Sequence, residues 1–144
     1  MEAEFRVYRS DDDEVRALQR RMPSELFPIC EHLLGRWQDA GLPLRPTARG
    51  FAMQAPLEER LQSIAWVYAP DARHREPRLE VALDLLRRRG VPAEDLEALR
   101  ERLDHYVDAE SAAGLATVTI TSSHSTEDAE RLAGVLVQFA RSLS

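Results

Sequence analysis

Apolar residues recur at the spacing of one helix face over four stretches of the chain. Residues 10–22 open with a serine and four acidic residues, which suit the positive end of a helix dipole. Residues 24–40 carry a wide apolar stripe followed by a glycine, as helices commonly do. Residues 93–107 and 126–143 repeat the pattern, and Ser125, with an acid three residues later, predicts a capping box.

Alternating and β-branched residues predict strands over residues 3–9, 51–55, 63–69 and 116–121. Residues 41–50 and 69–78 are predicted as loops, because proline, glycine and charged residues dominate them. Pro56–Arg60 is predicted as a loop or a single helical turn. Residues 79–89 fit two interpretations: their apolar residues alternate as in a strand, while Gly90 and the preceding arginines suit the end of a helix. Both alternatives stay open.

These elements predict an α+β fold, and the length of 144 residues suits a single domain over residues 1–144. We expect a small, mostly antiparallel sheet of about three to five strands, with helices packed on one face and a C-terminal helix that closes the core. Parallel pairing of the last strand is an alternative, because long helical segments separate it from the other strands.

Composition and charge narrow the classes of function. The net charge is −6, whereas a dedicated nucleic-acid binder usually carries a basic face, so nucleic acid is a disfavoured partner. All 19 basic residues are arginine and asparagine is absent too, which indicates a high-GC, bacterial genome. The single cysteine, Cys30, excludes an internal disulfide and fits a reducing cytoplasm. No signal peptide or membrane span is predicted.

No motif identifies catalysis, a metal site or a cofactor. Cys30 and His32 would point to different sides of their helix, so we expect no metal there and a buried, apolar role for the cysteine. Ser122–Ser125 surround His124 with hydroxyls, but the G-x-S-x-G elbow is missing and a capped helix start explains the pattern. The glycines match no phosphate-binding loop. We therefore expect no cofactor and favour a non-enzymatic role.

The main candidate for a binding site is a basic cluster at the predicted loop 69–78, which comprises Arg73, His74, Arg75 and Arg78. Arginine side chains bind carboxylates and phosphates through two-point contacts, so a protein or an anionic ligand is the expected partner. Arg87–Arg89 follow a short distance along the chain. A solvated loop, with favourable charge at a helix end, is the alternative explanation.

The sequence thus predicts a binding or accessory module that acts through its surface. The alternative function is a small cytoplasmic enzyme or ligand-binding protein with an apolar pocket lined by Trp66, Tyr68 and His124. Apart from that alternative, Trp37 and Trp66 are predicted as core residues. A homodimer is a further expectation, because unpaired strand edges and apolar helix faces are commonly buried at two-fold interfaces.

Part of the chain resembles a small α+β family of unknown function, whose members occur alone or fused to restriction-type and predicted transport proteins. The resemblance covers residues 47–143, and the segments that carry it are Phe51–Ala55, Ile64–Ala69, Leu79–Leu85, Ala116–Thr121 and STEDAERLAGVLVQFARSL. The helical insert at 92–109 and the absence of lysine depart from the family pattern, and no functional residue carries over. The opening FRVYRSDDDEVRALQRRMP is similar to the start of GNAT acetyltransferases, but the acetyl-CoA loop of that family is missing.

Overall fold

The computed structural model describes residues 13–109, 111–112 and 114–143. Its helices are α1 (Asp13–Arg20), α2 (Phe27–Asp39), α3 (Leu83–Arg88), α4 (Ala93–Leu103) and α5 (Thr126–Ser142). Its strands are β1 (Leu44–Thr47), β2 (Gly50–Leu57), β3 (Arg60–Tyr68), β4 (Arg78–Val81) and β5 (Ala116–Thr119). The predicted strand at residues 3–9 and the serine cap at position 10 lie outside the described residues.

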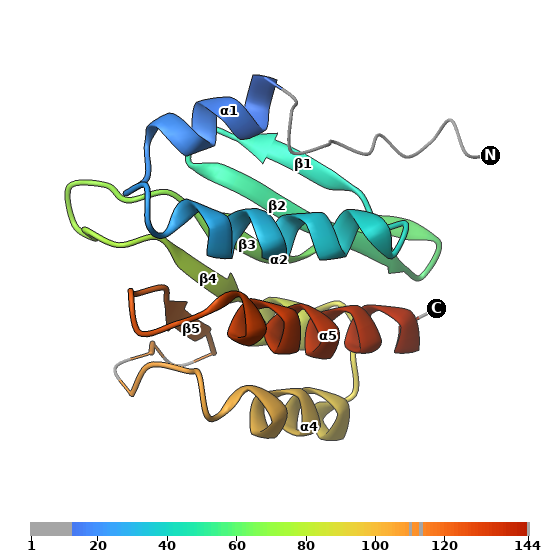
Figure 1. The fold of residues 1–144 in the computed structure, drawn as a ribbon. Coiled ribbons are helices and arrows are strands. Elements are labelled where there is room, and N and C mark those ends of the chain that lie inside the picture. Colours follow the sequence, from blue (N-terminus) through green and yellow to red (C-terminus); the bar gives the residue numbers. More distant parts are fainter. Residues whose placement is uncertain (1–12, 110, 113, 144) are drawn as a thin grey trace.

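The strands form one antiparallel sheet in the order β1-β2-β3-β4-β5 (Figure 1). Helices α2 and α5 lie side by side across one face of this sheet, and α4 packs against α5. The predicted α+β fold, with helices on one face and a closing C-terminal helix, is therefore confirmed. The last strand pairs antiparallel with β4, so the parallel alternative was wrong.

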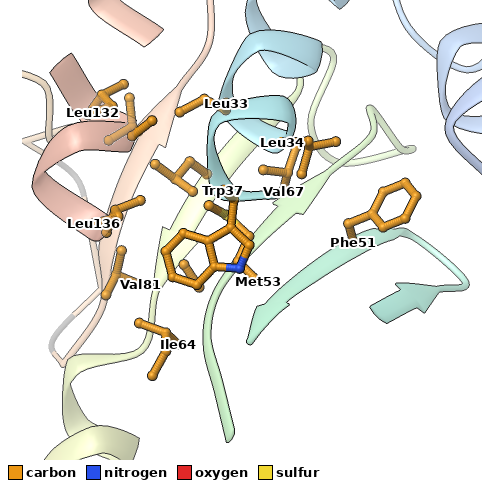
Figure 2. Close-up of a cluster of buried hydrophobic side chains, with 14 of the residues drawn as sticks. Leu33, Leu34, Trp37, Phe51, Met53, Ile64, Val67, Val81, Leu132 and Leu136 are labelled. Carbon is orange, nitrogen blue, oxygen red and sulfur yellow. The ribbon is translucent and has the colours of Figure 1, made fainter. Parts of the chain in front are cut away.

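The core fills the space between the sheet and the α2–α5 pair. Trp37 of α2 is 0% exposed, and Figure 2 shows its indole among apolar side chains from both helices and the sheet. Its Nε1 donates a hydrogen bond of 3.0 Å to the carbonyl oxygen of Pro43, which ties the end of α2 to the start of β1. Gly41 makes this short connection with a φ of 81°, a conformation that glycine adopts without strain.

The segment between the two longest strands differs from its prediction. Leu57 pairs with Arg60, so Glu58 and Glu59 alone form the turn of a β-hairpin, with φ of 52° and 66°. Of the two alternatives for Pro56–Arg60, the helical turn was wrong, and the loop is shorter than expected because it comprises only these two residues. Two-residue hairpin turns with positive φ favour Asn-Gly, and this turn has neither residue, so local sequence gave no signal. Pairing of β2 with β3 imposes the conformation.

In two other segments, strand pairing decides the structure that the sequence left open or concealed. Residues 79–89 combine both interpretations, because β4 ends at Val81 and α3 begins at Leu83. The predicted loop 41–50 contains β1, which pairs with β2 in a register that joins Leu44 to Met53. The prolines and glycines of this segment predicted a loop, and the strand was missed because it is only 4 residues long.

Both edges of the sheet carry features that disfavour pairing with a further strand. In β1, the carbonyl oxygen of Pro43 accepts the Gln54 amide, so alternation places the backbone groups of Leu44 and Pro46 on the outer edge. Pro46 has no N–H to offer there. On the outer edge of β5, Thr117 O accepts the Asp108 amide at 2.8 Å, and the Asp108 carboxylate accepts the Thr119 amide at 3.2 Å.

Replacing Glu59 with glycine should stabilise the protein by about 1 kcal/mol, because the substitution removes a left-handed, non-glycine residue from the hairpin turn. Urea unfolding followed by circular dichroism measures the change. Glu97→Gly in the middle of α4 is the matched control and should cost about 1 kcal/mol, since glycine weakens a helix interior. A loss of stability in Glu59→Gly would contradict the assigned turn.

Candidate functional site

The face of the sheet opposite α2 and α5 is polar and aromatic, and we call it the open face. Ala65 and Val67 point to the core and are 0% exposed, so Trp66 and Tyr68 between and after them point the other way. The cross-strand register defines two rows on this face: Ala52, Trp66, Glu80 and Thr117, and then Gly50, Tyr68, Arg78 and Thr119. Trp66 and Tyr68 are partly exposed. Trp66 is therefore not the core residue that its apolar surroundings in the sequence predicted.

Tyr68 lies between two guanidinium groups, and we call this the Arg–Tyr–Arg stack. The guanidinium carbons of Arg49 and Arg78 lie 4.5 Å and 4.7 Å from the centre of the tyrosine ring. Arg49 comes from the turn before β2 and Arg78 opens β4, and these strands flank β3 on opposite sides. The two cations thus approach the ring from its two sides, in the geometry of cation–π contacts.

Gly50 allows Arg49 to reach this position. A β-carbon at Gly50 would lie 1.9 Å from the carbonyl oxygen of Val67, so only glycine lets the strand approach β3 here. The carbonyl oxygen of Arg49 then accepts the Ala69 amide at 2.8 Å. This backbone contact fixes the start of the Arg49 side chain beside Tyr68.

Arg78 is buried and holds the centre of the site together. It is 4% exposed, and its Nε donates a hydrogen bond of 3.0 Å to Oε2 of Glu80. Its Nη1 lies 3.7 Å from Oδ2 of Asp71, an ion-pair distance that is too long for a hydrogen bond. The residue expected to be a surface contact is thus a structural charge beneath the open face.

The loop between β3 and β4 is folded around Asp71. Its Oδ1 accepts the backbone N–H groups of Arg73 and His74, both at 2.9 Å. These two bonds are the main reason that the pKa of Asp71 falls to about 2. Arg73, His74 and Arg75 are exposed on this loop. The basic cluster therefore divides into three exposed residues and the buried Arg78.

Burial, followed by the Glu80 carboxylate, raises the pKa of Tyr68 and outweighs the two guanidinium groups, which lower it. The Tyr68 hydroxyl therefore stays protonated at neutral pH and is available as a hydrogen-bond donor. Within the described residues, Arg45, Arg49, Arg73 and Arg75 have no carboxylate partner within ion-pair distance. This end of the sheet can therefore accept negative charge.

His124 comes from the turn after β5, whereas Trp66 and Tyr68 lie on β3. It follows β5, and its Nδ1 accepts the Thr121 amide at 3.1 Å. Ser125 and Asp128 form the predicted capping box of α5, so the serine-rich turn serves as a helix start. Four surface grooves lined by described residues do not include Trp66, Tyr68 or His124, and the pocket that these three would line stays a prediction.

The largest of these grooves, about 700 Å³, lies between α3, α4 and the segment that leads to β5. Its rim is charged, with Asp84, Glu97 and Glu101 beside Arg87 and Arg100. No group of three or more His, Cys, Asp or Glu side chains in the described part of the chain could hold a metal ion. Cys30 is 0% exposed, and burial raises its pKa to about 12, which fits the predicted apolar role.

Comparison of the chain with protein-family models, with curated proteins and with solved structures finds no match. The resemblance of residues 47–143 to a family of unknown function therefore stays a prediction. None of the described helices is both long and apolar enough to cross a membrane. The function of this chain must consequently be inferred from the geometry of the open face.

Sequence reasoning missed Arg49, which the structure places at the centre of the candidate site. The predicted loop over residues 41–50 assigned it no role, because the strand before it was not recognised. One signal was present: Arg-Gly comes directly before an apolar strand, and a glycine there often marks a close approach of two backbones. Only the pairing of β2 with β3 shows that the approach is to Tyr68.

Arg78→Ala should lower the free energy of unfolding by about 3 kcal/mol, because it leaves Glu80 without its partner in a largely buried site. Arg73→Ala is the matched control and should change stability by less than about 0.5 kcal/mol, since Arg73 is exposed. Urea unfolding of both variants gives the comparison. Equal urea midpoints for the two variants would show that Arg78 does not stabilise the site.

The loop 70–77 should keep its fold well into the acidic range. The folded-state pKa of Asp71 is lowered from 3.8 to about 2, so its contribution to stability is complete above 3.8 and is lost as the pH falls through about 2. The amide shifts of Arg73 and His74 in NMR spectra should therefore titrate with a midpoint near that lower value. A midpoint at the ordinary value for aspartate would mean that the two amides do not bind the carboxylate.

Proposed function

We propose that this chain is a non-enzymatic binding module that docks a protein partner on its open face, at the end formed by the Arg–Tyr–Arg stack and the loop 70–77. The observation that carries the proposal is the pair of partly exposed aromatic residues, Trp66 and Tyr68, on the middle strand and on the sheet face opposite α2 and α5. Aromatic and arginine side chains are the residues enriched at protein interfaces.

The edges of the sheet disfavour the addition of a further strand, and this supports docking of a partner on the face of the sheet. Pro46 on β1 and the Asp108 contacts on β5 disfavour the addition of a further strand at either edge. The helix-covered side offers no comparable aromatic surface, because Trp37 and the other large apolar side chains there are buried. Among the described surfaces, the open face therefore offers a partner the most aromatic contact.

Site-specific photo-cross-linking in the producing cell tests the proposal. The photoreactive amino acid p-benzoylphenylalanine replaces Trp66, an aromatic position on the open face. Gly134 on α5 is the control position, because it is exposed and a side chain there meets nothing within 4 Å. We expect adducts with a defined protein from position 66 and none of that species from position 134.

The exposed loop residues supply a second variant for the same assay. Arg73→Glu with Arg75→Glu should lower the adduct yield from position 66 without lowering the melting temperature, because both side chains are exposed. Adducts of equal yield from positions 66 and 134 would contradict the proposal. So would adducts that consist only of small molecules, which would favour the pocket alternative.

A further inference from the structure

We propose that the partner segment is acidic and that Arg49 is the residue that anchors one of its carboxylates on the open face. This inference depends on the proposed function, since it names the chemistry of the partner that the open face would dock. It goes beyond the basic loop, because Arg49 belongs to the turn before β2 and not to the 69–78 cluster.

The Tyr68 ring holds the Arg49 guanidinium in a defined position. Arg49 is exposed to solvent, yet its guanidinium carbon lies 4.5 Å from the centre of the Tyr68 ring. A free arginine on a surface must lose rotamer freedom when it binds, and this cost weakens exposed ion pairs. Stacking on Tyr68 has already restricted the side chain, so a ligand that reaches its N–H edge avoids much of that cost.

Arginines without a carboxylate partner leave positive charge available on the open face. Asp71 and Glu80 both lie within ion-pair distance of Arg78. Arg49 has no carboxylate partner among the described residues, and neither has Arg45, which shares the open face two strands away from Trp66. A planar guanidinium without a carboxylate partner presents a two-point fork that matches a carboxylate.

The stacking on Tyr68 favours an acidic protein segment over a nucleic acid. Single-stranded nucleic acids bind through bases that stack on open aromatic faces. The guanidinium groups of Arg49 and Arg78 already stack on Tyr68, so a base would have to displace one of them to stack on that ring. An acidic peptide needs only the Arg49 fork, the apolar surface of Trp66 and the hydroxyls of the neighbouring strands.

Isothermal titration calorimetry with synthetic peptides tests the inference on the full chain. The probe is a short peptide in which glutamate alternates with leucine or serine, and the control probe carries glutamine at each glutamate. We expect the glutamate peptide to bind at least about tenfold more tightly, with an affinity that falls as salt is added, because exposed charge pairs are screened. In NMR spectra its binding should shift the Nε–H signal of Arg49.

Variants locate the contact. Arg49→Gln should weaken binding of the glutamate peptide about tenfold, as expected for an interface arginine, while Arg20→Gln on α1 should leave it unchanged. Tyr68→Leu keeps the charge of Arg49 but removes the ring that positions it, so it should weaken binding of the glutamate peptide and not of the glutamine peptide. The NMR spectrum of each variant confirms that it is folded.

Three results would overturn the inference: no binding of the glutamate peptide, equal affinities for the two peptides, or an Arg49→Gln variant that binds like the parent protein. Tighter binding of a single-stranded oligothymidylate than of the glutamate peptide would also overturn it and indicate a nucleic-acid partner. These failures are distinguishable from failure of the proposed function, because a protein adduct at position 66 would still identify the open face as the docking surface.

Discussion

A guanidinium group buried at the end of an antiparallel sheet organises the surface on which the proposed function depends. Removing a charge from water is costly unless it is paired, and Arg78 is 4% exposed. Glu80 pairs with it along β4, Asp71 faces it from the loop, and Tyr68 stacks on it from β3. These contacts fix one end of three neighbouring segments, and through the tyrosine ring they also fix Arg49.

The two faces of the sheet have different physical tasks. On the helix-covered face, Trp37 and its neighbours bury apolar surface and supply the stability of the fold (Figure 2). On the open face, Trp66 and Tyr68 remain partly exposed, and the polar groups around them are bound to one another. An exposed side chain of this region, such as Arg49, can change with little effect on the core, which suits a surface that binds a partner.

The elements with strong local patterns could be predicted from the sequence, and those made by long-range pairing could not. The apolar stripe of α2 and the Ser125–Asp128 capping box lie where periodicity and spacing predicted them. The hairpin turn at Glu58 and Glu59 contradicts local preferences, so only the pairing of its strands produces it. The same applies to the site: the sequence indicated the basic loop and named Tyr68, but neither the burial of Arg78 nor the stacking of Arg49 follows from spacing.

The proposed anchoring role of Arg49 requires an ordered side chain, and this order can be measured in solution. NMR relaxation of the arginine Nε–H groups reports their motion on the picosecond-to-nanosecond timescale. The account predicts an order parameter for Arg49 of about 0.8, close to that of rigid backbone, and a value below about 0.6 for the unstacked and exposed Arg45. An Arg49 side chain as mobile as that of Arg45 would contradict the claim that the Arg–Tyr–Arg stack holds an anion-binding fork in place.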